Sequence, residues 1–419
     1  MEKWLEGRRG SGWWLGALLV AALYGGTLSF GLTYDDLLLI KKWPLAELMS
    51  KWSEPWSERF YRPLINFFFT GEHLLFGGAA WGYHLVNLLL AAIVVGIYQR
   101  ILRGFQVSAL PALLCALLWL ALPGNGAVIT WISAQIDLFA LVFMLAAFYL
   151  VQSAAAQPRR RAGRVGLSLF MAMLAYGSKE ISVTLPLLIA AWLIIMAPLP
   201  RRQALGLLLP HLALWAAYFV WRAVVLGART VGERGFSENP WVAERPLAGI
   251  AGMMIRYFEA LLSTLYPLFL MPSWLTALLM LVLLGLLAGM IWKRRVTLQL
   301  CSRGSALLLT FAGIAALPNM LDASPRLLGV PTLAVAAMTV LAIRRLLADA
   351  PRLRPQIIIM AALLLFSYLH INGEVQACFT QPVYRSTLQY DSNDRRRWPF
   401  SDLHNLRYSM RETFLKMVQ

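Results

Sequence analysis

Residues 128–151 read VITWISAQIDLFALVFMLAAFYLV, and this stretch decides the class of fold. It carries no charged residue after position 137, and it is long enough to cross a hydrocarbon core, which takes roughly 20 apolar residues in a helix. Of all 419 residues, 59% are hydrophobic and 14% are charged, whereas a soluble protein carries roughly 25% charged residues. The composition therefore predicts an all-α polytopic membrane protein and excludes a soluble enzyme, a disordered chain and a secreted disulfide scaffold.

Ten further stretches resemble 128–151 in length and apolar content. With it, the expected spans are 13–32, 81–98, 108–123, 128–151, 165–177, 181–198, 203–226, 271–292, 304–320, 326–345 and 356–371. Segment 247–268 is less apolar because it carries Arg256 and Glu259, and we interpret it as an interfacial or re-entrant helix on the outer side. The sequence thus predicts a bundle of about eleven transmembrane helices with outer-face loops and interfacial helices.

Positive charge sets the expected orientation, because cytoplasmic loops are enriched in Lys and Arg. If the N-terminus is cytoplasmic and 247–268 does not cross, one face receives the basic clusters at 100–103, 159–164, 201–202, 293–303 and 344–354. This distribution explains the net charge of +17 without nucleic acid as a partner. Residues 1–371 are then one transmembrane module, and residues 372–419 form a short tail on the outer, periplasmic side.

Nearly all carboxylates fall in the outer segments, and we expect 33–80 and 227–270 to form an active-site face. Asp35 and Asp36 are adjacent at the end of the first span. Paired acids can deprotonate a hydroxyl or bind a metal, because crowding raises one of the two pKa values. A solvated helix cap or a topology signal is the alternative interpretation of this pair.

Other polar residues fall at the outer ends of the expected spans. Asp137 lies in an apolar helix, where a charge is costly unless it faces the bundle interior, a wet cavity or a basic partner. Lys179 and Glu180 could line the floor of an outward cavity or simply cap a hinge. His84 and Asn87 share one helix face, and hydrogen bonding between helices is the simpler explanation for both.

Three arginines complete this face, namely Arg62, Arg256 and Arg326. A guanidinium can bind a phosphate through its planar fork, although an arginine at a membrane interface can also merely snorkel toward water. Acids suited to base chemistry and cations suited to phosphate therefore occur on one face. Together they predict a phosphate-bearing lipid substrate.

The order of several motifs adds a resemblance to a known family. They are TYDDLLLI (33–40), YRPLINFFFTGEHLLFG (61–77), GYHLVNLLL (82–90), WISAQIDLFALVFMLAAFYL (131–150), YGSKEISVTLPLLIAAW (176–192) and, more weakly, SPRLLGVPTLAVAA (324–337). With them the chain resembles, over about residues 13–345, the GT-C superfamily of integral-membrane glycosyltransferases. The likeness is greatest to its branch of protein O-mannosyltransferases and TMTC-like proteins.

The resemblance implies an inverting transfer of sugar from a polyprenyl-phosphate donor to an acceptor hydroxyl on a protein, glycan or lipid. Asp35 or Asp36 would be the catalytic base. From charge and position, Arg62, Lys179, Arg256 and Arg326 would hold the donor phosphate, and His84, Gln135, Asp137 and Glu180 would contact substrate. No cofactor is required with certainty; a divalent metal (Mg²⁺ or Mn²⁺) on Asp35, Asp36 and Asp137 stays open. The expected location is a bacterial inner membrane with a periplasmic active site.

The chain also departs from the TMTC-like pattern. Ala134-Gln135 stands where Gly-Arg is usual, which removes a cation, and Arg326-Leu327-Leu328 stands where Arg-Tyr-Leu is usual. No 34-residue repeat follows the last span. Two alternatives therefore stay open: a transporter or flippase of lipid-linked sugars, and a non-catalytic subunit of envelope biosynthesis. The sugar, the acceptor, the lipid length and the oligomeric state are not readable from the sequence.

Overall fold

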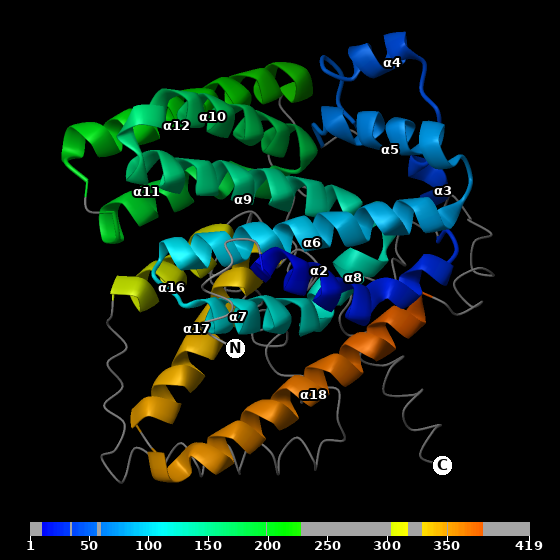
Figure 1. Ribbon diagram of the computed structural model, residues 1–419. Helices are drawn as coiled ribbons and strands as arrows, with labels where there is room; N and C mark the ends of the chain where they lie inside the picture. Colours follow the sequence, from blue (N-terminus) through cyan, green and yellow to red (C-terminus); the bar gives the residue numbers. More distant parts are fainter. Residues whose placement is uncertain are drawn as a thin grey trace, which may run out of the picture.

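The computed structural model describes residues 11–33, 36–56, 60–197, 199–227, 303–316, 329–349 and 351–379. Within these ranges the regular structure is helical throughout, which confirms the all-α prediction for the described part of the chain. The helices lie across one another in a layered bundle, with α6 and α9 near its centre (Figure 1).

The α-helices have the following bounds. They are α2 (Ser11–Tyr24), α3 (Asp36–Leu39), α4 (Leu45–Ser50), α5 (Pro63–Phe76), α6 (Ala80–Gly104), α7 (Ala109–Ala121), α8 (Pro123–Thr130), α9 (Gln135–Ala156), α10 (Arg161–Ser178), α11 (Leu185–Ile195), α12 (Arg201–Leu226), α16 (Arg303–Ala316), α17 (Gly329–Asp349) and α18 (Arg354–Cys378). In the described part of the chain, five 3₁₀ turns lie between them: η1 (Gly25–Ser29), η2 (Ile132–Ala134), η3 (Pro158–Arg160), η4 (Glu180–Thr184) and η9 (Pro351–Leu353).

Five helical segments of the described chain are long and apolar enough to cross a membrane. They are Ala80–Gly104, Ile132–Ala156, Arg201–Leu226, Pro331–Ala348 and Arg354–Ala377. A sixth arises if α7 and α8, which meet at 76°, form one broken span. The expected span 271–292 lies outside the described residues, and α10, expected to span at 165–177, is a helix that fails this test. The expected count of about eleven is therefore not confirmed.

The stretch 128–151 does not form one helix, which corrects the prediction. Pro123 starts the short helix α8, which ends at Thr130, and the extended backbone of Trp131 (φ −84°, ψ 122°) separates it from η2 and α9. Mean hydropathy did not reveal this break, because the polar residues nearest Trp131, Thr130 and Ser133, are uncharged and the stretch stays apolar on average. The apolar helix that results is Ile132–Ala156, and its first turns lie among polar side chains described below.

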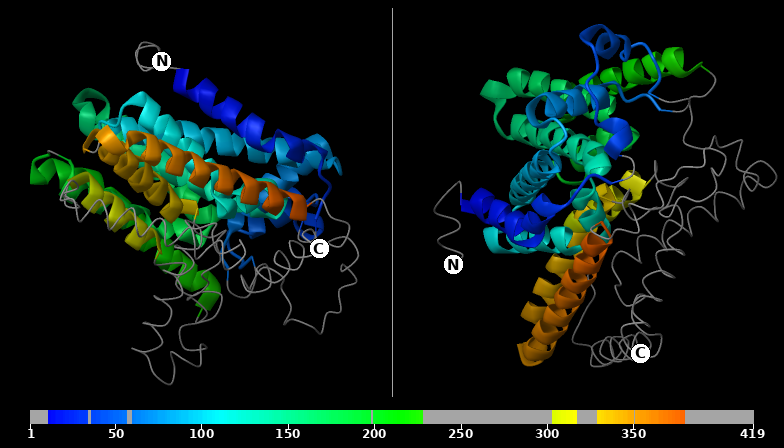
Figure 2. Two further views of the ribbon diagram at one scale, coloured as in Figure 1. Left: turned by 90° about the horizontal axis from the view of Figure 1, so that it is seen from below. Right: turned by 90° about the vertical axis from the view of Figure 1, so that its right-hand side faces the viewer.

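Close approach between α2 and α6 depends on glycine. A Cβ on Gly96 would lie 2.4 Å from the indole ring of Trp13, and a Cβ on Gly16 would lie 2.6 Å from Val95. Small residues allow helix backbones to come together in membrane proteins, where dispersion replaces the hydrophobic driving force. These two glycines therefore hold the first helix against the centre of the bundle (Figure 2).

Buried hydrogen bonds join helices that are distant in sequence. The side-chain amide of Asn372 on α18 donates to the Tyr24 hydroxyl (2.6 Å) and to the Leu120 carbonyl (2.9 Å). The Tyr98 hydroxyl on α6 donates to the Leu333 carbonyl at 2.6 Å. Helix α18 continues to Cys378, whereas we expected the span to end at residue 371 and the tail to begin at residue 372. Asn372, the first residue of the expected tail, is buried inside the bundle.

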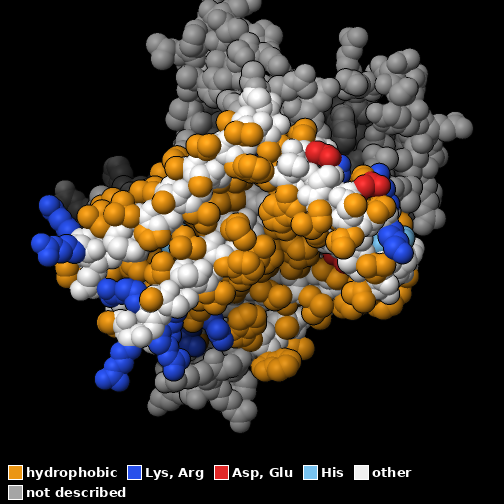
Figure 3. All heavy atoms as spheres, turned by 90° about the horizontal axis from the view of Figure 1, so that it is seen from above, with side chains coloured by type: hydrophobic (Ala, Val, Ile, Leu, Met, Phe, Trp, Pro, Cys, Tyr) orange, Lys and Arg blue, Asp and Glu red, His pale blue; other side chains and the backbone are white. Residues whose placement is uncertain are grey.

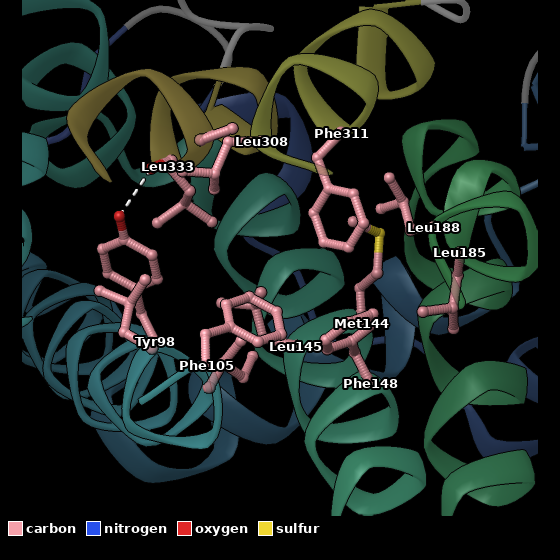
Figure 4. A pocket seen from close by; sticks show the side chains of 13 residues that line it. Tyr98, Phe105, Met144, Leu145, Phe148, Leu185, Leu188, Leu308, Phe311 and Leu333 are labelled. Carbon is pink, nitrogen blue, oxygen red and sulfur yellow. Dashed lines mark hydrogen bonds between the residues drawn. The ribbon is translucent and has the colours of Figure 1, made fainter. Parts of the chain in front are cut away.

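An apolar pocket lies between α6, α9, α11, α16 and α17 (Figure 4). Its lining residues include Tyr98 on α6, Phe105 directly after α6, Phe148 on α9 and Phe311 on α16. About 560 Å³ of space, including its open mouth, is free of atoms. The pocket lies at the C-terminal end of α6. Polar side chains instead gather around the N-terminal end of α6, so this pocket does not belong to the polar site.

Charge is distributed unevenly over the surface. On the face shown in Figure 3, Lys and Arg side chains gather at one end, and the visible acidic side chains lie at the other, beside a few basic ones. In the sequence, loops rich in Lys and Arg alternate with loops that carry most of the carboxylates, and such an alternation brings like charges to the same end of a helical bundle.

Candidate functional site

Residues 133–137, which run from η2 into the first turn of α9 and are called the junction before α9, form the centre of a polar cluster inside the bundle. Ser133, Gln135 and Asp137 are spaced two residues apart, and each contacts an ionisable side chain from a different part of the chain. Their partners are Asp36, Glu72 and Lys179, respectively. Residues 133–137 therefore join the start of α3, α5 and the end of α10.

Asp36, the first residue of α3, ties the start of this helix to the junction. Its Oδ1 accepts hydrogen bonds from the backbone N–H (2.8 Å) and hydroxyl (2.5 Å) of Ser133. Its Oδ2 accepts from the backbone N–H (2.7 Å) and hydroxyl (2.9 Å) of Thr33. Burial raises the pKa of Asp36, and these four donors oppose that effect. The carboxyl group is 1% exposed and is engaged at both oxygens, so its observed role is to fix the loop.

Asp137 and Lys179 form a buried ion pair. Lys179 follows the last residue of α10 with extended backbone, and this geometry directs the chain toward α9. Of the alternatives open from the sequence, the structure shows the one in which Asp137 has a basic partner. Without that partner a carboxylate in this apolar helix would be strongly disfavoured.

Arg62 and Glu180 form a second ion pair, with two-point geometry. Arg62 precedes Pro63, the first residue of α5, and its Nε and Nη2 donate to Glu180 at 3.0 and 2.8 Å. The guanidinium also lies 4.0 Å from the ring centroid of Phe60. Arg222 from α12 approaches the same carboxylate, with Nη1 3.7 Å from Oε1. Glu180 therefore lies between two guanidinium groups.

Sequence reasoning missed Arg222, although a signal was present. It is a lone arginine near the end of an apolar span, and such residues usually face the bundle interior. It also missed the tyrosines around it. The ring of Tyr218 lies 5.1 Å from that of Tyr176 and 6.3 Å from that of Tyr61, and the Trp221 indole donates to the Tyr61 hydroxyl at 2.8 Å. Aromatic side chains thus enclose the Arg62–Glu180–Arg222 cluster on one side.

Glu72 is a further residue that sequence reasoning missed, although it is a single acid within the apolar helix α5. Gln135 donates to it, with Nε2 3.2 Å from Oε2. Glu72 is 6% exposed, and burial raises its pKa to about 8, an effect that the Gln135 hydrogen bond partly opposes.

His84 and Asn87 are both buried on α6. Asn87 donates to the carbonyls of Ile129 (3.0 Å) and Trp131 (3.1 Å), as the interhelical alternative predicted. His84 lies edge-on to Phe30, with 6.1 Å between ring centroids.

Three predicted site residues, Asp35, Arg256 and Arg326, lie outside the described residues, as does nearly all of segment 227–270. Among the residues that are described, no group of three or more His, Cys, Asp or Glu side chains could hold a metal. Asp36 and Asp137, two members of the metal set left open by the sequence, are engaged by separate partners.

Comparisons with known proteins give a partial similarity. Protein O-mannosyl-transferase TMTC3 of Mus musculus is 31% identical over 143 residues, 31% of this chain and 15% of that protein. Protein O-mannosyl-transferase Tmtc2 of Drosophila melanogaster is 30% identical over 145 residues, which are 30% of this chain and 15% of that protein. Protein O-mannosyl-transferase Tmtc1 of the same species is 26% identical over 199 residues, which are 44% of this chain and 23% of that protein. The chain thus spans less than a quarter of these relatives. No family model and no solved structure matches it.

Proposed function

We propose that this protein is a membrane glycosyltransferase that moves a sugar from a polyprenyl-phosphate donor to an acceptor hydroxyl at the periplasmic face of a bacterial inner membrane. One observation carries the proposal. Polar residues from four of the motifs that resemble protein O-mannosyltransferases converge on the junction before α9, although they are far apart in sequence. Similarity to proteins named O-mannosyl-transferases supports the same class of reaction.

In the proposed reaction a carboxylate removes the proton of the acceptor hydroxyl. The oxygen then attacks the anomeric carbon from the side opposite the phosphate, a new C–O bond forms, and the lipid phosphate leaves with the electron pair of the old bond. This displacement inverts the anomeric centre. We assign the base to Asp35, because both oxygens of its neighbour Asp36 already accept hydrogen bonds from Thr33 and Ser133.

The departing phosphate needs positive charge, since preorganised cations stabilise charge that develops in a transition state. Arg62 and Arg222 converge on Glu180, and Lys179 precedes Glu180 in the chain. We propose that the phosphate binds beside these cations and shares them with Glu180 and Asp137. Arg256 and Arg326, which were assigned to the phosphate from sequence, stay proposals of the same kind.

Transfer of radiolabelled sugar from a polyprenyl-phosphate sugar by purified protein tests the assignment. Wild type would be compared with Asp35→Asn, Asp36→Asn and the control Glu47→Gln, an exposed acid on α4. We expect Asp35→Asn to lose transfer while it still binds the donor, and Glu47→Gln to match wild type. Asp36→Asn should lower transfer through a displaced loop. Equal activity of Asp35→Asn and wild type would refute the assignment of the base.

A non-catalytic subunit is the alternative that one observation favours. Arg62 and Lys179, both expected to hold phosphate, are already engaged by carboxylates. If wild type binds lipid phosphate and consumes none of the sugar donors, this alternative replaces the enzyme, and a flipping assay in proteoliposomes then separates a subunit from a flippase.

A further inference from the structure

The contact between Glu72 and Gln135 leaves two buried oxygen atoms without a hydrogen-bond partner. Glu72 is 6% exposed and Gln135 is fully buried. Gln135 donates to Glu72 Oε2 at 3.2 Å and to the Tyr83 carbonyl at 3.4 Å. Within the described residues, however, Oε1 of Glu72 and Oε1 of Gln135 have no donor. Buried polar atoms are rarely unpaired. Both unpaired atoms are acceptors, so a donor hydrogen is missing from this contact.

The charged groups around Glu72 do not supply that hydrogen. Elements α4, α6, α10 and the junction before α9 surround α5. From α6, Tyr83 interacts electrostatically with Glu72, and its hydroxyl donates to the Gly77 carbonyl at 2.6 Å. Lys179, just after α10, is bound to Asp137. Glu47, the titratable residue within α4, is exposed, and His73 neighbours Glu72 on α5 itself. The backbone of Lys41 contacts Thr70 of α5, and its ammonium group lies over the Trp43 ring. None of these residues forms an ion pair with Glu72 in the described structure.

We propose that Glu72 is a positioning residue that acts as a neutral carboxylic acid, whose proton completes the contact with Gln135 and holds α5 on the junction before α9. A carboxylic acid and a primary amide each have one donor side and one acceptor oxygen, so they are complementary. Protonation converts one of the two unpaired oxygens into the donor that the other requires. A carboxylate at this position would instead be a buried charge with no cation paired to it among the described residues.

The position of Glu72 gives this proton a consequence for the site. Helix α5 begins directly after Arg62, which binds Glu180, and the junction holds both Asp36 and Lys179. The Glu72–Gln135 contact therefore joins the two halves of the polar cluster. Its loss should displace Arg62 relative to Asp36 without removing either side chain.

The expected pH dependence follows from the raised pKa of Glu72. The folded state binds the proton more tightly than the unfolded state, so the stabilisation is fully present below the ordinary pKa of 4.5 and is lost progressively as pH rises to about 8. The ionised fraction of Glu72 in the folded state grows from about one tenth at pH 7 to about nine tenths at pH 9. Wild type should therefore lose thermal stability up to about pH 8 and little more at pH 9, so the interval between pH 7 and pH 9 contains the end of the loss.

Infrared spectroscopy of the purified full chain tests the proposal directly, because a protonated carboxyl group has a carbonyl stretching band that a carboxylate lacks. The wild-type spectrum minus that of Glu72→Gln should contain this band at pH 6.5, and the band should titrate away with a midpoint near pH 8. Gln135→Arg should remove the band at pH 6.5 by placing a cation beside Glu72. The control Glu47→Gln should leave it unchanged.

Thermal unfolding between pH 7 and 9 supplies the second readout. Glu72→Gln keeps the shape of the acid and cannot ionise, so its unfolding midpoint should be less dependent on pH than that of wild type. Absence of the band from the difference spectrum, or an unaltered pH dependence of unfolding in Glu72→Gln, would overturn the proposal. Only a third readout, the pH profile of sugar transfer, rests on the proposed function. If no variant transfers sugar while the band titrates, the proposed function fails and the inference about Glu72 stands.

Discussion

The Arg62–Glu180 ion pair allows a quantitative test of how the polar cluster is held together. Glu180→Gln keeps the size of the side chain but removes the charge that lies between Arg62 and Arg222. Removing one partner of a buried pair costs about 3–5 kcal/mol, because the other charge stays buried and unpaired. The Glu180 side chain is 22% exposed, so we expect the lower end of this range, about 3 kcal/mol.

Arg62→Met should cost a similar amount, about 3 kcal/mol, since Glu180 keeps only the more distant Arg222. The double variant should cost much less than the sum of the two, because it removes both charges together. A coupling free energy of about 2–3 kcal/mol between the two positions is the expected result.

Unfolding of the purified protein in mixed micelles, with increasing mole fraction of a denaturing detergent, measures these free energies. The pair Lys51 and Glu54 is the matched control: its charged atoms are 2.6 Å apart, but the side chains are 21% and 46% exposed. Water and salt screen exposed pairs, so they contribute little to stability, and the cycle of Lys51→Met and Glu54→Gln should give a much smaller coupling than the cycle of Arg62 and Glu180. Equal coupling for both pairs would refute the claim that burial makes the Arg62–Glu180 pair important.

Two further predictions concern the loop and the helix contacts. Ser133→Ala removes the hydroxyl that donates to Asp36 at 2.5 Å and should destabilise the protein by about 1.5–3 kcal/mol; an unchanged unfolding free energy would show that this bond does not hold the loop. Gly96→Ala would place a Cβ 2.4 Å from Trp13 and should cost about 1–3 kcal/mol by overpacking. Gly71→Ala, where no atom lies within 4 Å, should stabilise by about 0.5–1 kcal/mol; if both glycine variants shift the unfolding midpoint equally, the α2–α6 contact is not tight.

The sequence predicted the helical class and most helix positions because both follow from local apolar content. Expected spans 81–98 and 203–226 lie within α6 and α12. It did not predict the break at Trp131, since hydropathy averaged over the whole stretch does not record a change of backbone direction within it.

The sequence indicated several residues of the candidate site, but it did not indicate which of them contact one another. Asp36, Arg62, Asp137 and Lys179 were all selected from the sequence, and all lie in or beside the polar cluster. Which acid binds which base depends on how distant elements meet, as with Asp36 and Ser133, 97 residues apart. Two cations assigned to a phosphate are consequently ion-paired with carboxylates.

Glu72 and Arg222 were missed for a different reason. Each is a single charge within an apolar stretch, which is itself a signal of an interior position. Asp137 was selected on this same signal, whereas Glu72, in the motif that begins with Tyr61-Arg62, and Arg222, outside the quoted motifs, were not. Their partners, Gln135 and Glu180, become evident only when the helices are packed.

The central claim is that this polar cluster serves a lipid-phosphate sugar donor, and the choice of donor tests it most directly. Purified protein in detergent would be offered a radiolabelled polyprenyl-phosphate sugar or the matching nucleotide sugar. A detergent extract of bacterial membranes would supply acceptors in both reactions. The account predicts that the lipid donor is consumed, that free polyprenyl phosphate accumulates, and that Asp35→Asn abolishes both. Consumption of the nucleotide sugar instead, or consumption of the lipid donor that Asp35→Asn leaves unchanged, would contradict it.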